Sequence, residues 1–128
     1  MNDPRPELYT SLQKACTRLD EGCRQSTDEL QRDGVLQRFE FTFELFWKTL
    51  ASFLNYEGFQ TKGPRSCIQE AARRGFIMQG EVFLDMLEDR NKITHIYNEA
   101  LANEIFTRVR DVYLKMLLSN LQLLKSFL

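Results

Sequence analysis

The chain has 128 residues, of which 43% are hydrophobic and 27% charged, a composition typical of soluble globular proteins that argues against disorder and a membrane span. Its 17 basic and 18 acidic residues leave a net charge of −1, without the basic excess of proteins that hold nucleic acid by bulk electrostatics. This length fits one domain, residues 1–128, and because no signal-like apolar segment opens the chain, we expect it in the cytoplasm.

Apolar residues in the first half of the chain recur every three or four positions, the spacing that gathers side chains on one face of a helix. This pattern predicts a first helix over residues 6–31 and a longer second helix over 35–56. Phe41 and Leu45 widen the apolar face of the second helix beyond what one neighbour would cover, so we expect it to be central. Gly58, just past its end, is the expected C-terminal cap.

The second half of the chain continues this helical pattern. A short third helix is predicted over 65–74, between Gly63-Pro64 and Gly75, and a fourth over 81–92. The last helix should run from residue 98 or 99 through the tail, on an apolar stripe of Leu101, Ile105, Val109, Val112, Met116 and Leu123 or Leu124. These segments predict an all-α, antiparallel, up-and-down bundle of four or five helices, whose surplus apolar surface fits either the core or a homodimer interface.

Most familiar catalytic and metal motifs are absent from the sequence. The three cysteines form no Cys-x-x-Cys pair, which favours small buried residues over a disulfide framework or zinc site. With one histidine, a metal site would rest on Asp85, Glu88 and Asp89, and a solvated acidic helix face explains these residues better. We therefore expect no metal.

The segment from Arg90 to Tyr97 combines a guanidinium, an imidazole and a phenol. In a continuous helix, residues five apart point about 140° away from each other, so Arg90 and His95 would converge only if the helix ended between them. His95 and Tyr97, two apart, share one side of an extended segment. An extended junction would thus gather all three for phosphate chemistry, with arginine holding phosphate oxygens and histidine moving a proton. The alternative is a structural histidine.

The spacing Arg90-x4-His95-x-Tyr97 resembles the Arg-x4-His-x-Tyr signature of HEPN-domain proteins, specifically the HepT-like toxins once described as nucleotidyltransferase substrate-binding proteins. Residues 37–50 look like that family's aromatic second helix, and residues 80–91 resemble its approach to the active site. The resemblance covers nearly the whole chain, most securely residues 35–100.

This resemblance implies a homodimer that faces both copies of the motif into one cleft and cleaves RNA without metal or cofactor. His95 would transfer protons, Arg90 would stabilise the transition state, and Asn91 would support the site through hydrogen bonds. Tyr97 matches a tyrosine that a partner nucleotidyltransferase of the MntA type modifies with AMP, which would block RNA entry.

Two alternatives stay open. In one, the chain is a non-catalytic subunit that presents substrate or nucleotide to a separate nucleotidyltransferase, which its mild acidity favours over RNA binding. In the other, it is a structural dimer in which Arg90 merely pairs with Asp89 or Glu88. The presence of a histidine at this spacing favours the nuclease.

Overall fold

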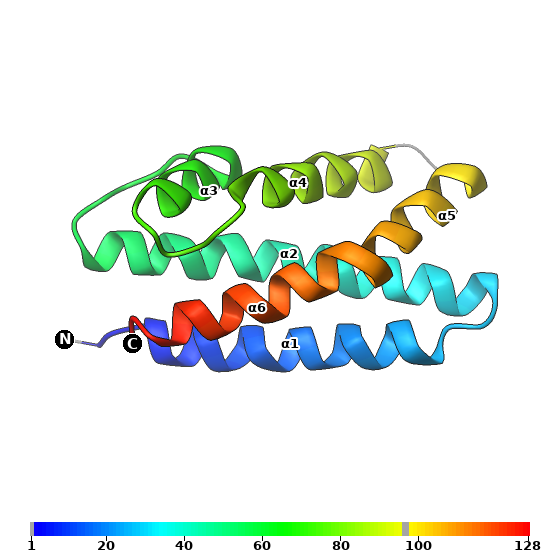
Figure 1. Cartoon of the computed structure of the whole chain (residues 1–128), viewed down its shortest axis with the longest axis horizontal. Coiled ribbons are helices and arrows are strands. Elements are labelled where there is room, and N and C mark those ends of the chain that lie inside the picture. The colour runs from blue at the N-terminus through cyan, green and yellow to red at the C-terminus, as the bar shows by residue number, and fades with distance from the viewer. Residues whose placement is uncertain (1, 96–97) are drawn as a thin grey trace.

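A computed structural model describes residues 2–95 and 98–128 as helices joined by short loops (Figure 1). The elements are α1 (Arg5–Gln25), α2 (Glu29–Tyr56), α3 (Pro64–Arg73), α4 (Gly80–His95), α5 (Glu99–Arg108), the π-helical stretch η1 (Val109–Tyr113) and α6 (Leu114–Lys125). Over these ranges there is no strand, which confirms the predicted all-α class.

The long helical segments of the chain alternate in direction. α1 and α2 run antiparallel, α4 runs back along α2 after the short α3, and the continuous α5–η1–α6 segment returns across the bundle (Figure 1). α2 packs against α1, α3, α4 and α5, which confirms that it is the central helix.

Aromatic side chains of α2 form the centre of the core. Phe39, Phe43 and Phe46 are at most 1% exposed. Phe46 stacks on Phe83 of α4 with 4.6 Å between ring centroids, and Phe39 stacks on Tyr113 of η1 at 5.7 Å. Because burying one such ring stabilises a fold by about 2–3 kcal/mol, these contacts hold α4 and η1 on α2.

The boundary between the first two helices differs from the prediction, because α1 ends at Gln25 and α2 already begins at Glu29. Asp28 caps α2 by accepting a hydrogen bond from the Gln31 backbone N–H at 2.8 Å. The Gln31 side chain in turn accepts from the Thr27 N–H at 2.7 Å. This reciprocal pair satisfies N–H groups that otherwise lack partners and starts the helix early.

Glycines end the helices where predicted. Gly58 has φ +90°, and the Phe59 N–H reaches back to the Leu54 carbonyl at 2.9 Å, which confirms the expected cap. A side chain is strained at such φ values, so glycine is favoured here.

The last helix contains the wider turn η1, which changes the face it buries. Val112, predicted in the apolar stripe, is 45% exposed, and Tyr113 is buried instead, with Leu117 and Leu121 next in line. Residues spaced by four drift about 40° per step around an α-helix, and one π turn, with its i→i+5 bonding, offsets much of that drift. The α-helical extrapolation through Val112 was therefore wrong.

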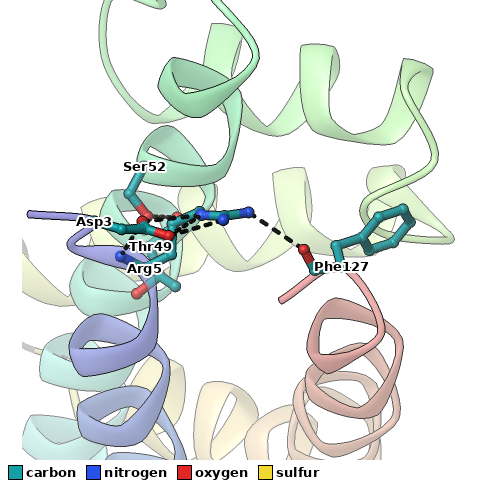
Figure 2. Close-up of polar contacts among 5 residues, drawn as sticks. All are labelled: Asp3, Arg5, Thr49, Ser52 and Phe127. Atoms are coloured by element: carbon teal, nitrogen blue, oxygen red, sulfur yellow. Dashed lines mark hydrogen bonds and ion pairs between the residues drawn. The ribbon is translucent and has the colours of Figure 1, made fainter. Parts of the chain in front are cut away.

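Arg5 fastens the start of α1 to the ends of α2 and α6 (Figure 2). Its guanidinium pairs with Asp3 at 2.8 Å and donates to the Phe127 carbonyl at 3.2 Å. The same group lies 3.5 Å from the Tyr56 ring centroid, a cation–π contact. One side chain thus connects the start of α1 with the ends of α2 and α6.

Two further features concern cysteines and membranes. Cys16, Cys23 and Cys67 are buried and free, as predicted. Among the helices described, none combines the length and apolarity needed to cross a membrane.

Candidate functional site

Arg90, Asn91 and His95 all lie on α4, which continues through His95. The expected helix end between Arg90 and His95 is therefore wrong, and helical geometry points the two side chains about 140° apart. No glycine or proline separates them, and the Thr94 hydroxyl bonds to the Arg90 carbonyl at 2.9 Å within the helix. Tyr97 lies outside the described residues, so its predicted place beside the other two is not described.

Arg90 is paired with α2. Its Nη1 donates to Glu44 Oε2 at 3.1 Å, and the side chain is 24% exposed. The hypothesis that Arg90 pairs with Asp89 or Glu88 is therefore wrong: the carboxylate comes from 46 residues earlier in the sequence. Within the described part of the chain, Arg90 Nε is buried and has no hydrogen-bond partner.

Glu44 joins three side chains at this surface. The Trp47 indole N–H donates to the oxygen that Arg90 uses, at 3.1 Å, and Lys48 Nζ lies 3.4 Å from the other oxygen. Glu44 therefore compensates much of the positive charge here, and an anionic ligand would compete with it for Arg90.

Glu40 lies one turn before Glu44 on α2. Burial raises the pKa of the Glu40 carboxyl, while the Arg90 charge and the Thr94 hydroxyl oppose that rise. Arg90 thus faces two carboxylates of α2, Glu44 through an ion pair and Glu40 through its charge.

His95 and Asn91 are both exposed, on the last turns of α4. One chain therefore presents an exposed imidazole and a carboxylate-paired guanidinium on different sides of the same helix. These residues do not form one catalytic group within a single chain.

Asp89, which precedes Arg90, faces the core. It is 3% exposed and accepts from Arg108 Nε and Nη2 at 2.8 and 3.0 Å and from the Tyr113 hydroxyl at 2.6 Å. Burial raises the pKa of Tyr113, which keeps its hydroxyl a donor. Asp89 is therefore a structural anion, whereas Asp85 and Glu88, the other carboxylates considered for a metal, are exposed.

A pocket of about 230 Å³ opens beside this surface, between α2 and the α4–α5 corner. Its lining comprises Asp33, Leu36, Gln37, Glu40, Ile93, Asn98, Leu101, Ala102 and Ile105. Sequence reasoning missed it, although Asp33, Gln37 and Glu40 recur at helical spacing and share one face of α2.

The comparisons with known proteins agree with this architecture. The family model described as "Nucleotidyltransferase substrate binding protein like" matches residues 7–126. The chain belongs to this family. A crystal structure of a protein from Thermus thermophilus is similar to this family member, with 32% sequence identity, a TM-score of 0.72, and coverage of 91% of this chain and 94% of that one. No curated protein matches.

Family membership confirms the substrate-binding part of the resemblance drawn from the sequence. The assignment of this nucleotidyltransferase substrate binding-like protein to the HEPN or HepT-like toxins stays a prediction. So do its homodimeric state and the roles of Arg90, Asn91, His95 and Tyr97.

Proposed function

We propose that this chain is a non-catalytic subunit that binds substrate or nucleotide for a separate, small nucleotidyltransferase. The match over residues 7–126 to a family named for that role supports the proposal. The observation that carries it is the unbroken α4: Arg90 and His95 lie on different sides of one helix, so within one chain these two side chains do not act on the same bond.

The surface around Arg90 suits binding better than chemistry. Arg90 is held by Glu44 and lies close enough to Glu40 to influence its pKa, next to a pocket with an apolar floor. Convergent polar groups at the mouth of an apolar pocket are typical of ligand sites. The subunit would hold its ligand there while the partner enzyme transfers the nucleotidyl group.

Mixing the chain with a small nucleotidyltransferase from the same organism tests this proposal. We expect one complex in size-exclusion chromatography and faster nucleotidyl transfer than with the enzyme alone. Arg65→Ala, an exposed arginine on α3, serves as the control for Arg90→Ala, which should reduce transfer. Absence of both a complex and stimulation would contradict the proposal.

A second candidate function is a metal-independent endoribonuclease toxin, which the Arg90-x4-His95 spacing and the exposure of His95 support. In a homodimer, His95 of one copy could approach Arg90 of the other, with Asn91 in support. Phe41, 65% exposed on α2, would supply apolar surface for such an interface. The antitoxin would be an MntA-like nucleotidyltransferase that places AMP on Tyr97.

Incubating RNA with the protein in excess EDTA separates the two functions. The nuclease predicts cyclic-phosphate ends from the wild type and from Arg65→Ala but none from a folded Arg90→Ala/His95→Ala variant. If none of the three proteins cleaves any of several RNA classes, the nuclease function is excluded and the binding-subunit function remains. Treatment with the partner enzyme and ATP should add AMP to the wild type but not to Tyr97→Phe if the toxin hypothesis holds.

A further inference from the structure

The pocket between α2 and the α4–α5 corner has an apolar floor and one apolar wall. Ile93 and Leu101, which are partly exposed, form the wall on the α4–α5 side. Leu36 and Ile105 are at most 5% exposed, so their methyl groups lie deep in the bundle and form the floor of the pocket. An apolar floor beside an apolar wall suits one face and one edge of a flat ring system.

The volume limits what can enter. At about 230 Å³ the pocket lies below the roughly 300–1,000 Å³ of sites that enclose a drug-sized ligand. One fused heterocycle is a suitable occupant, whereas a sugar and phosphates would remain outside.

The polar rim selects the chemistry of the ring. Asp33 is engaged by Arg32 at 2.9 Å, and the Asn98 side chain accepts from the Leu101 N–H at 3.1 Å. By contrast, the Gln37 amide forms no hydrogen bond to any residue that the structure describes, and it offers one donor edge and one acceptor. An amide of this kind pairs with the adjacent amino group and ring nitrogen of adenine.

Glu40 completes the rim as a hydrogen-bond acceptor beside Gln37. A carboxylate accepts from an exocyclic amino group and repels anions, so it favours the amino-bearing base and disfavours a phosphate inside the pocket. Arg90 is not part of the pocket lining, but it is near enough to Glu40 for its charge to oppose the rise in the pKa of Glu40. A phosphate attached to the bound base and lying outside the pocket would therefore be attracted to Arg90.

We propose that this pocket is an adenine subsite: the base lies on the floor formed by Leu36 and Ile105, and the Gln37 amide pairs with its amino edge. This inference rests on the proposed substrate- or nucleotide-binding function and specifies the base that is bound.

Calorimetric titration of the full chain with adenosine and inosine tests the subsite, because inosine replaces the amino group with an oxygen. Since a bidentate amide–adenine pair is worth roughly 1–3 kcal/mol of discrimination, adenosine should bind roughly 5- to 150-fold more tightly than inosine. Gln37→Leu should reduce that difference several-fold, and Ala102→Leu, which fills the pocket from α5, should abolish binding of both nucleosides.

Gln13→Leu on α1 makes the same chemical change at another exposed position and should leave both affinities unchanged. Equal binding of adenosine and inosine, no binding of either, or an unaltered preference in Gln37→Leu would overturn the adenine subsite. Complex formation with the nucleotidyltransferase and stimulation of its transfer are measured separately. A stimulated complex without adenosine binding removes the adenine subsite alone, and absence of both the complex and the stimulation removes the proposed function.

Discussion

Arg108 of α5 donates two parallel hydrogen bonds, at 2.8 and 3.0 Å, to Asp89 of α4. Asp89 directly precedes Arg90, the arginine of the candidate site. The Tyr113 hydroxyl adds a third bond at 2.6 Å. Arg108 is 39% exposed on its side chain and Asp89 only 5%, so the carboxylate depends on these donors for charge compensation. The network fixes how α4 rests on the last helix, and hence where Arg90 points.

Asp89→Ala should lower the free energy of unfolding by about 3 kcal/mol, the low end for breaking a buried ion pair, because Arg108 is partly solvated. Urea unfolding followed by the fluorescence of Trp47, the single tryptophan, measures the change. Asp85→Ala, at an exposed position of the same helix, should change stability by less than about 0.5 kcal/mol. Similar losses in both variants would show that Asp89 has no special role.

Glu44→Gln should barely affect stability, by less than about 1 kcal/mol, because Arg90 and Glu44 are 24% and 37% exposed. It should strengthen ATP binding several-fold, since the glutamine no longer neutralises Arg90. The Trp47 indole donates to Glu44, so its fluorescence reports the titration. Weaker ATP binding in Glu44→Gln would indicate that Glu44 positions Arg90 rather than competing for it.

Replacing Glu40 should remove a specific pH dependence. Burial raises the pKa of Glu40 above its ordinary 4.5, so the folded state holds this proton more firmly than the unfolded state. The Glu40 contribution to stability therefore falls as pH rises from 4.5 through the folded pKa and is constant above it. Urea unfolding of the wild type and of Glu40→Gln across this range should show their difference changing in that direction. A difference that grows in favour of the wild type with rising pH would contradict the assignment.

The three cysteines should resist thiol reagents in the native state. Burial raises the pKa of Cys16 to about 12 and those of Cys23 and Cys67 to about 11, so at pH 8 roughly one thiol in a thousand or fewer is ionised. Colour from a disulfide reagent should appear only after urea is added, when all three thiols react. Rapid reaction of one thiol without urea would show local opening of the helix that carries it.

The course of α2 was predictable because its apolar residues recur over many turns, and a long periodic stretch leaves few alternatives. Its start was mispredicted because Asp28 and Gln31 form a local cap in a polar segment that looks like a loop. The sequence also contained the periodicity of Asp33, Gln37 and Glu40, but only the approach of α5 turns that face into a pocket.

The candidate site was harder to predict for a physical reason. Arg90 could be singled out by its spacing from His95, yet its actual partner, Glu44, lies 46 residues away and follows from the packing of α4 on α2. The end of α4 also differs from the prediction. Residues 91–94 contain no glycine or proline that would end a helix, so α4 continues to His95.

The π turn η1 gives the last helix one residue more than regular α-helical winding would need to place the same faces inward. Within it, Tyr113 reaches Asp89, and beyond it the Leu121 carbonyl accepts from the Tyr9 hydroxyl at 3.1 Å. A chain shortened by one residue within 110–112 would close the π turn into regular α-helix and keep the contacts on both sides in phase. The same deletion in the regular turns of α5 or α6 would rotate the flanking contacts by about 100° about the helix axis, so the last helix should tolerate the loss of a residue at η1 far better than elsewhere.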